Sequence, residues 1–189
     1  MDFFHTFGMP GRWYTELFEV AADQNGYVTT EDAHELGAAA QVLVDMHRHG
    51  QLERVAHGLY RFAAFPPGAL DEFMQATLWP RRLGVISHDS ALDLWDLCDV
   101  NPPKIHITVP KSARLRRRKP PMYEVHVRDL DPGDVTKFEG IPVVVARRAI
   151  LDGLERHLDK RLIGQAMEAA TRRGLVTGEE LGAIEAAAV

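Results

Sequence analysis

The sequence predicts an α+β protein of two domains, residues 1–65 and residues 66–189. Three observations predict it. Apolar residues recur at helical spacing in several stretches, short alternating runs stand between these stretches, and a Phe-Pro-Pro-Gly break begins at Phe65. The chain has 189 residues, 46% of them hydrophobic, which is enough for each domain to bury a core.

The first domain is predicted to contain three helices and a hairpin. An amphipathic helix over 12–24 ends at Asn25-Gly26, a short second helix begins with Thr30 as its N-cap, and a third covers 39–49. Two alternating runs within 52–62 flank a turn and indicate a short β-hairpin. This order is typical of a winged helix-turn-helix, in which the third helix enters the major groove and the hairpin lies along the phosphates.

The second domain is predicted to be a mixed α+β domain with a mainly antiparallel sheet. Helices come first, then strands, then helices again. Ser87 is expected to cap the helix that follows it, and Glu139-Gly140 is expected to form a tight hairpin turn. The predicted helices cover 70–78, 87–97, 147–157, 159–173 and 178–187, and the predicted strands cover 85–86, 104–109, 123–127, 135–138 and 141–145.

Charge is distributed unevenly along the chain. The net charge is −5, yet residues 101–130 hold eight Lys and Arg against two Asp and Glu. We name the basic segment by its six cations, which are Lys111, Arg114, Arg116, Arg117, Arg118 and Lys119. Such a density of like charge repels itself and favours a polyanion or an acidic protein surface. The segment could contact DNA, bind an acidic partner, or form a solvated hairpin loop.

Several classes of protein are disfavoured by composition. No apolar run approaches the ~20 residues of a membrane helix, and the first residues lack a secretory pattern. Cys98 is the single cysteine, so an internal disulfide or a cysteine-rich zinc site is excluded. We therefore expect a cytoplasmic protein with no membrane partner.

Catalytic motifs are missing from the sequence. It contains no phosphate-binding loop, no Gly-x-Gly-x-x-Gly and no His-Glu-x-x-His. Ser87, His88 and Asp89 are adjacent, so on a helix their side chains diverge and a helix start explains them better than a nucleophile and base. His106 and His126 could meet across a sheet, but without a third ligand they are interpreted as sheet residues. The sequence thus predicts no catalytic residue and no metal site.

Four phrases taken in order resemble one family. They are ELFEVAADQNGYVTTEDAHELG, GQLERVAHGLYRFAAFP, VISHDSALDLWDLCDVNPPKIHITVPKSARLRRR and DVTKFEGIPVVVARRAILDGL. Together they resemble the AbiEi family of antitoxins over about residues 12–155. The resemblance implies a bacterial antitoxin whose winged helix binds inverted repeats and represses its own operon, with a homodimer on DNA as one possibility. It also implies that the remaining chain neutralises a co-expressed nucleotidyltransferase-like toxin, without a metal or an organic cofactor.

The third predicted helix departs from the family pattern because Ala39, Ala40 and Asp45 stand where basic or polar groups are expected. Gln41 could read adenine, and arginines nearby could hold phosphates. The predicted DNA-binding residues are Thr29, Thr30, Gln41, His47, Arg48, Arg54, His57 and Arg61.

An acidic row is the predicted surface for the toxin, because cations would be repelled from a surface that competes with a phosphate substrate. Asp89, Asp93, Asp96 and Asp99 recur at spacings that place them on one side of a helix and its end. A solvated helix face is the alternative. Two other functions also remain open: a stand-alone winged-helix regulator with a ligand-binding or dimerising second domain, and an enzyme that modifies the toxin.

Overall fold

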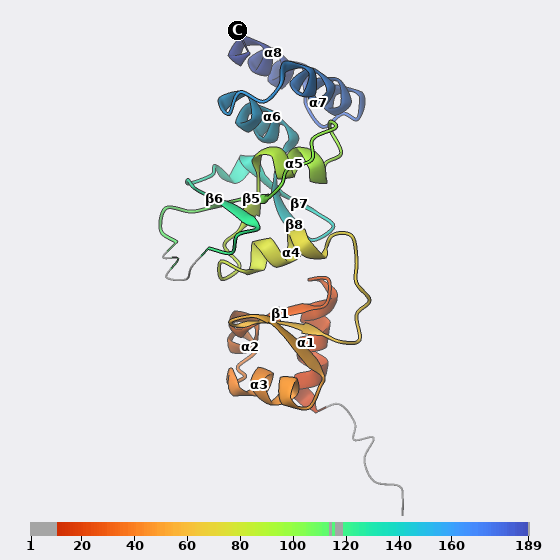
Figure 1. The fold of residues 1–189 in the computed structure, drawn as a ribbon, viewed down its shortest axis with the longest axis vertical. Helices are drawn as coiled ribbons and strands as arrows, with labels where there is room; N and C mark the ends of the chain where they lie inside the picture. Colours follow the sequence, from red (N-terminus) through yellow and green to blue (C-terminus); the bar gives the residue numbers. More distant parts are fainter. Residues whose placement is uncertain (1–10, 114, 116–118, 189) are drawn as a thin grey trace, which may run out of the picture. The chain divides into compact units, whose positions relative to one another are not determined.

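The computed structural model describes residues 11–113, 115 and 119–188. The chain divides into two compact units, one ending at Gln75 and the other beginning at Ala76. Each unit combines helices with a β-sheet, as the predicted α+β class requires, and Figure 1 labels their elements. Among the described residues, no helix is both long and apolar enough to cross a membrane.

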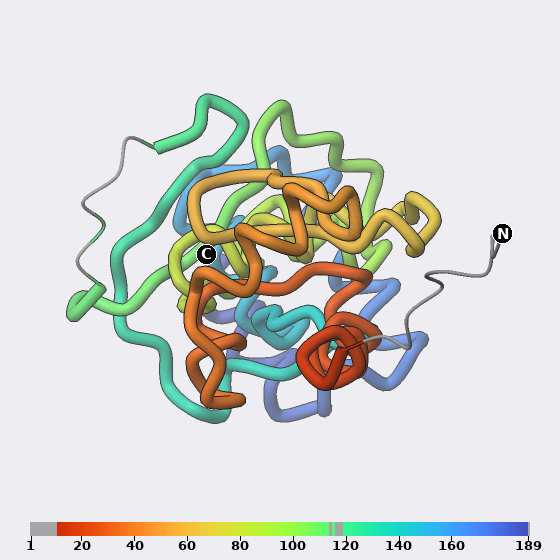
Figure 2. Tube along the Cα trace, turned by 90° about the horizontal axis from the view of Figure 1, so that it is seen from below, coloured from red at the N-terminus to blue at the C-terminus, as the bar shows by residue number. Residues whose placement is uncertain are grey.

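The first unit is a winged helix-turn-helix, as predicted. Its helices are α1 (Arg12–Ala22), α2 (Thr30–Glu35) and α3 (Gln41–Arg48), and its strands are β1 (Tyr27–Thr29), β2 (Leu52–Ala56) and β3 (Leu59–Phe62). The three strands form an antiparallel sheet in the order β1-β3-β2. Figure 2 looks along α1, and the rest of the unit lies to one side of that helix.

Aromatic side chains form the centre of this core. Phe62, at the end of the hairpin, is completely buried, and its ring lies edge-on to the rings of Tyr14 and Phe18 at 5.3 and 5.2 Å. Phe65 packs on Phe18 at 4.9 Å and reaches the turn after α1. There Gly26 has a φ of 87°, and a Cβ on it would lie 2.6 Å from Phe65 Cβ. Only glycine therefore fits this turn.

The start of α2 differs from the prediction by one residue. Thr29, not Thr30, is the N-cap: its hydroxyl accepts a hydrogen bond from Asp32 N at 3.1 Å, and Asp32 Oδ2 accepts one from Thr29 N at 2.7 Å. This reciprocal pair is a capping box, which satisfies two backbone donors that the helix would otherwise leave open.

The second unit is built on a five-stranded sheet in the order β6-β5-β4-β8-β7. Its strands are β4 (Val85–Ile86), β5 (Ile105–Val109), β6 (Tyr123–Val127), β7 (Val135–Phe138) and β8 (Ile141–Val144). The pairs β4–β5 and β7–β8 are antiparallel, whereas β5–β6 and β4–β8 are parallel. The sheet is thus mixed, with its antiparallel partners at β4–β5 and at the β7–β8 edge.

The parallel pairing of β5 with β6 corrects one interpretation of the basic segment. Ile105 pairs with Tyr123 and Val109 with Val127, so both strands run in the same direction. A hairpin joins antiparallel strands only. The basic segment is therefore a crossover connection and not a hairpin loop. In contrast, β7 and β8 do form the predicted hairpin, with positive φ at both Glu139 and Gly140, as a type I′ turn requires.

Helices cover one face of this sheet. The helices that follow the sheet strands are α6 (Ala146–Glu155), α7 (Lys160–Arg172) and α8 (Gly178–Ala187), and α5 (His88–Leu94) lies between β4 and β5 in sequence. α5 packs on β5 and on α6, and α6 packs on α7 and α8. A further helix, α4 (Asp71–Leu78), spans the division between the two units, and a short 3-10 helix, η1 (Pro132–Asp134), precedes β7.

Candidate functional site

The outer face of α3 carries the predicted base-reading residue. Leu43 and Met46 are buried in the core of the first unit, whereas Gln41 and Arg48 are exposed. Both exposed side chains contact one acid, because Asp45 Oδ1 lies 2.9 Å from Gln41 Nε2 and 3.4 Å from Arg48 Nη1. The face that would enter a DNA groove therefore holds a carboxylate that neutralises its single arginine.

Two histidines lie at the end of α3. His47 Nδ1 is 2.9 Å from the carbonyl oxygen of Leu52, the first residue of β2. His49 Nδ1 is 2.7 Å from the carbonyl oxygen of Asp45. His47, a predicted contact residue, thus links the third helix to the wing, and its ring remains at the surface of the unit.

The wing is the short hairpin of β2 and β3. Arg54 and His57 are exposed on it, and Arg54 Nη2 lies 3.4 Å from His57 Nδ1. Thr30 contacts the turn, because its backbone N–H donates to the carbonyl of Gly58 at 3.0 Å. The structure therefore brings three of the predicted residues, Thr30, Arg54 and His57, together at the tip of the hairpin.

Two of the predicted DNA-contact residues have side chains that are largely buried within the first unit. The Thr29 side chain is buried, and its hydroxyl is engaged by Asp32 in the capping box. The side chain of Arg61 is only 11% exposed, since it donates to the carbonyls of Phe65 and Pro66 and forms an ion pair with Asp71 at 3.2 Å. Both side chains make contacts within the first unit and are largely withdrawn from its surface.

The basic segment is fixed at its two ends by acids. Lys111 N donates to Asp129 Oδ1 at 3.0 Å, and Lys119 Nζ lies 3.4 Å from Glu124 Oε1. All four of these side chains are well exposed or partly exposed, so the pairs are weak. The four predicted contact residues between them, Arg114, Arg116, Arg117 and Arg118, lie outside the described residues.

The predicted acidic row is divided between α5, which holds Asp89 and Asp93, and the chain that follows it. α5 ends at Leu94, so Asp96 and Asp99 follow the helix instead of extending its face. Asp89 is half-buried, and Asp99 accepts a hydrogen bond from Gln165 Nε2 at 2.7 Å. Asp93 and Asp96 are exposed, and burial together with the Asp96 charge raises the pKa of Asp93.

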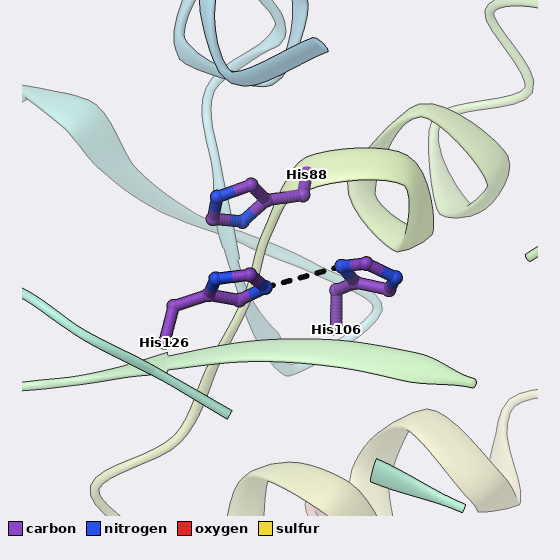
Figure 3. Close-up of side chains that lie close together, drawn as sticks. All are labelled: His88, His106 and His126. Atoms are coloured by element: carbon purple, nitrogen blue, oxygen red, sulfur yellow. Dashed lines mark hydrogen bonds between the residues drawn. The ribbon is translucent and has the colours of Figure 1, made fainter. Parts of the chain in front are cut away.

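A cluster of three histidines in the second unit was not predicted. His88 at the start of α5, His106 on β5 and His126 on β6 each offer a ring nitrogen, and these nitrogens lie within 4.8 Å of one another (Figure 3). The rings of His88 and His126 are stacked at 3.6 Å, and His106 Nδ1 is 3.1 Å from His126 Nε2. The prediction that His106 and His126 are sheet residues that could meet is confirmed, but it missed His88 as their third neighbour.

Burial controls the protonation of this cluster. It lowers the pKa of His88 to about 3 and that of His126 to about 4, with His106 adding to the effect at His126. Burial also lowers the pKa of His106. Asp152 acts in the opposite direction on His88, but the cost of desolvating a charged imidazole is larger. The three rings are therefore neutral at pH 7.

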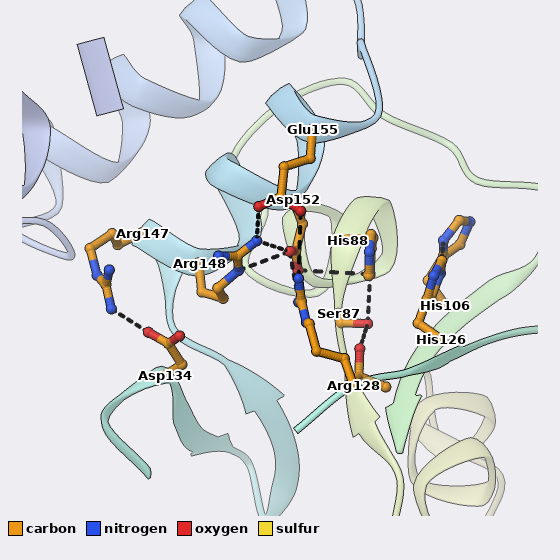
Figure 4. A network of polar contacts seen from close by, with 11 residues as sticks. Ser87, His88, His106, His126, Arg128, Asp134, Arg147, Arg148, Asp152 and Glu155 are labelled. Carbon is orange, nitrogen blue, oxygen red and sulfur yellow. Dashed lines mark hydrogen bonds and ion pairs between the residues drawn. The ribbon is translucent and has the colours of Figure 1, made fainter. Parts of the chain in front are cut away.

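Polar residues surround His88 on its other side (Figure 4). Ser87 occupies the N-cap position of α5, but its hydroxyl makes no capping hydrogen bond, which corrects the predicted role. It lies 2.8 Å from His88 Nδ1 and accepts a hydrogen bond from Thr108 Oγ1 at 2.8 Å. Asp152, which is fully buried, approaches the same ring nitrogen with Oδ2 at 3.7 Å.

Two arginines hold the Asp152 carboxylate in place. Arg128 Nη2 donates to Asp152 Oδ1 at 2.8 Å, and Arg148 Nε donates to the same atom at 2.8 Å. Arg148 also pairs with Glu155, and its neighbour Arg147 pairs with Asp134. The two guanidinium groups next to Asp152 are thus matched by two carboxylates.

The tertiary fold explains why sequence reasoning missed the cluster. His106 and His126 alternate with apolar residues on two strands, so a shared face could be predicted. His88 belongs to a helix start, and only the packing of α5 on β5 brings it over that face. The one local signal is the Ser-His-Asp-Ser run, which is too polar for the first turn of a buried helix; all of these residues except Asp89 are buried.

Comparisons with known proteins concern mainly the first unit. Residues 16–63 match the family described as "Transcriptional regulator, AbiEi antitoxin". A comparison with curated proteins gives no match. Among solved structures, the crystal structure of RV2827C protein from Mycobacterium tuberculosis is 16% identical, with a TM-score of 0.43 over 95% of this chain and 82% of that chain. The matched segment runs from within α1 past the end of β3, so the similarity to the AbiEi regulators lies in the helix-turn-helix and its wing.

Proposed function

We propose that this chain is the antitoxin of a bacterial toxin–antitoxin pair. It represses its own operon by binding inverted repeats through the first unit, and it neutralises a co-expressed nucleotidyltransferase-like toxin through the second. The observation that carries the proposal is the exposed face of α3 beside the wing, within the segment that matches the AbiEi transcriptional regulators.

On DNA, α3 supplies the base contact and the wing supplies phosphate contacts. Gln41 is the first residue of α3, and the N-terminal end of a recognition helix is the end that reaches base edges. Its amide can bond both N6 and N7 of adenine, which is worth roughly 1–3 kcal/mol of discrimination. Arg54 and Arg48 neutralise phosphates. Because Asp45 contacts both Gln41 and Arg48, we expect one copy of the chain to bind DNA weakly. Two copies would therefore share an inverted repeat.

On the toxin, the exposed acids after the middle of α5 are the contact surface. Asp93 and Asp96 are exposed and adjacent enough for the charge of Asp96 to raise the pKa of Asp93. A site that binds nucleotide phosphates is electropositive, so a pair of carboxylates complements its rim. The toxin is then blocked by direct contact, and the second unit acts as a binding partner with no catalytic step.

The DNA-binding part is tested by fluorescence anisotropy with the duplex upstream of the gene. Gln41→Ala should reduce the preference for this duplex over a shuffled one by about tenfold, since a base contact is lost. Arg54→Ala should weaken both duplexes alike and reduce the salt dependence by the equivalent of about one phosphate contact. Equal binding of the two duplexes by the unaltered protein would contradict the repressor function.

The toxin-binding part is tested by co-expression with the product of the adjacent gene, followed by size-exclusion chromatography. Co-elution is expected, and Asp93→Asn with Asp96→Asn should weaken it. Asp23→Asn is the matched control, because Asp23 is an exposed acid in the first unit. Separate elution of the two proteins contradicts neutralisation by direct contact.

Separate elution would favour the stand-alone regulator. That function has one structural feature in its support, a groove of about 640 Å³ formed by the last three helices. Leu154, Leu158, Ile163 and Met167 are among its lining residues, so it is partly apolar. A small apolar ligand that changes the DNA affinity of the chain would identify this alternative.

A further inference from the structure

We propose that His88, His106 and His126 form a binding site for a divalent transition-metal ion of the zinc class. The three side chains come from three different elements, α5, β5 and β6, and present one nitrogen each within 4.8 Å of the others. Imidazole nitrogen is the ligand type that Zn²⁺ shares with Co²⁺ and Ni²⁺. The site goes beyond the proposed antitoxin function and also departs from the metal-free expectation that the family resemblance carries.

The spacing of two of the nitrogens fits a metal directly. Two imidazoles bound to one tetrahedral Zn²⁺ at 2.0–2.1 Å have their nitrogens about 3.3 Å apart. His106 Nδ1 and His126 Nε2 are 3.1 Å apart. They lie on the same side of the sheet, because Thr108 pairs with His126 and shares a strand face with His106. The His88 ring, which is stacked on His126 at 3.6 Å, must turn so that one of its nitrogens points to the same place, and this completes a three-nitrogen set.

The backbone at His88 is strained in a way that serves this arrangement. Its φ is 53°, a left-handed conformation that costs a residue with a Cβ roughly 1–2 kcal/mol. In this conformation the His88 side chain lies over those of His106 and His126, as Figure 3 shows. Strained residues of this kind persist where the surrounding structure requires a particular side-chain position, which is common at ligand sites.

The residues around His88 resemble the outer shell of a metal site. Metal-bound histidines are usually oriented by a carboxylate or hydroxyl partner. Here the Ser87 hydroxyl lies 2.8 Å from His88 Nδ1 and Asp152 Oδ2 lies 3.7 Å from it. Asp152 Oδ2 is buried and accepts no hydrogen bond, although Oδ1 of the same carboxylate is bonded by Arg128 and Arg148. A metal ion bound to the three histidines would bring a positive charge close to Asp152 Oδ2, and this charge would compensate for the missing hydrogen bond.

The charges near the cluster also allow a cation. Arg128 and Arg148 are matched by Asp152 and Glu155, and the charges of Arg156 and Lys104, which lower the pKa of His106, are opposed there by Asp89 and Glu124. Asp89 acts on His106 from the other side, and its buried Oδ1 has no hydrogen-bond partner. The imidazoles are neutral, which is the form that binds metal. His126 is half-buried and provides access from solvent.

A bound ion would join the edge strand β6 to β5 and α5. β6 pairs only with β5 in the described sheet, so a metal bridge would add a second attachment for it. Because such a site forms only in the folded chain, binding energy adds to folding energy. The ion would therefore be a structural metal ion that stabilises the folded second unit.

The experiment titrates the full, chelator-treated chain with Zn²⁺ against a competing metal indicator and records the visible absorption of bound Co²⁺. One equivalent should bind, with a tetrahedral Co²⁺ spectrum and a rise in melting temperature on addition of Zn²⁺. His126→Ala should lower the affinity by at least about tenfold, since changes even to outer-shell partners cost this much. His34→Ala is the control and should bind as the unaltered chain does, because His34 is an exposed histidine of α2 outside the cluster.

A second variant covers the case in which His126→Ala does not fold. His88→Asn keeps a residue that tolerates positive φ and removes a ligand, so it should also lose the tightly bound equivalent. Binding of less than one equivalent by the unaltered chain would overturn the proposal. So would an unchanged affinity in a folded variant, or equal losses in the variants and in His34→Ala.

Discussion

The Asp45 carboxylate accepts a hydrogen bond from the side chain of Gln41 at 2.9 Å, one helical turn apart on the exposed face of α3. Arg48 approaches the same oxygen at 3.4 Å. Asp45 therefore competes directly with DNA for the side chains of Gln41 and Arg48 on the recognition helix. It also adds a negative charge to a face that must approach phosphates, in a domain whose sequence through residue 65 carries four basic residues against nine acids.

Asp45→Asn should increase DNA affinity. The change removes one negative charge and frees Arg48 to neutralise a phosphate, so we expect affinity to rise by about three- to tenfold at low salt. The slope of log affinity against log salt should become steeper by about one. Fluorescence anisotropy at several salt concentrations measures both quantities. Glu19→Gln, a matched loss of charge on α1, should change them much less; equal effects of the two variants would mean that Asp45 has no local role.

Arg61→Ala should destabilise the first unit without changing the salt slope of DNA binding. The guanidinium is buried against Asp71 and two backbone carbonyls, and removing it takes a donor from both carbonyls and the ion-pair partner from Asp71. The loss is about 2–3 kcal/mol in the free energy of unfolding. Urea denaturation followed by circular dichroism checks this value. A variant of normal stability whose salt slope is reduced by one would return Arg61 to the phosphate contacts.

Changing Arg116, Arg117 and Arg118 together to Ala tests the basic segment. If this segment contacts DNA, the salt slope of operator binding should flatten by about three, because three phosphate contacts disappear. Affinity for the toxin should then remain unchanged. An unaltered slope with weaker co-elution would assign the segment to an acidic surface on the toxin, and no change in either measurement would assign it to solvent.

The chelator-treated chain should lose stability between pH 7 and pH 5. The pKa of His88 is about 3 in the folded chain and near 6.5 when unfolded, so between these values the unfolded chain binds more protons. Stability is therefore complete above pH 6.5 and falls as the pH is lowered. For His88 alone the loss at pH 5 is about 2 kcal/mol, and a pKa of about 4 gives His126 a loss of similar size.

Urea denaturation at pH 7 and pH 5, with a chelator present, measures this loss. His88→Asn removes one of these contributions and should bring the two free energies of unfolding closer together by about 2 kcal/mol. Equal stabilities of the unaltered chain at the two pH values would mean that the cluster is hydrated and titrates normally.

The winged helix could be predicted because its signals are local. Glycines that end helices, hydroxyl groups that cap them and alternating hairpin strands all act within a few residues. The position of Asp32, three residues after Thr29, is itself a capping-box pattern that indicates Thr29 as the N-cap of α2. Arg61 and Arg54 look alike in sequence. They differ because Arg61 lies on β3, the central strand, where Tyr27 and Asp71 enclose it, and Arg54 lies on the edge strand β2.

The second unit depends on contacts that sequence spacing does not reveal. Alternation predicts the strands Ile105–Val109 and Tyr123–Val127, but it is the same for parallel and antiparallel partners. The histidine cluster required both the parallel register and the packing of α5. For this reason the sequence could predict that His106 and His126 are neighbours, but it could not predict that His88 joins them.

The direction of β6 limits how the gene can change in this region. Because β6 begins beside the start of β5, the chain between Val109 and Tyr123 must return along the whole strand, about 17 Å, before pairing can resume. Deletions that leave fewer than about five residues between the strands would pull β6 out of register and carry His126 away from its neighbours. Insertions between these two strands only lengthen the connection, and the added entropy cost of closing a longer loop is small. Length variation among natural relatives should therefore be biased toward longer connections.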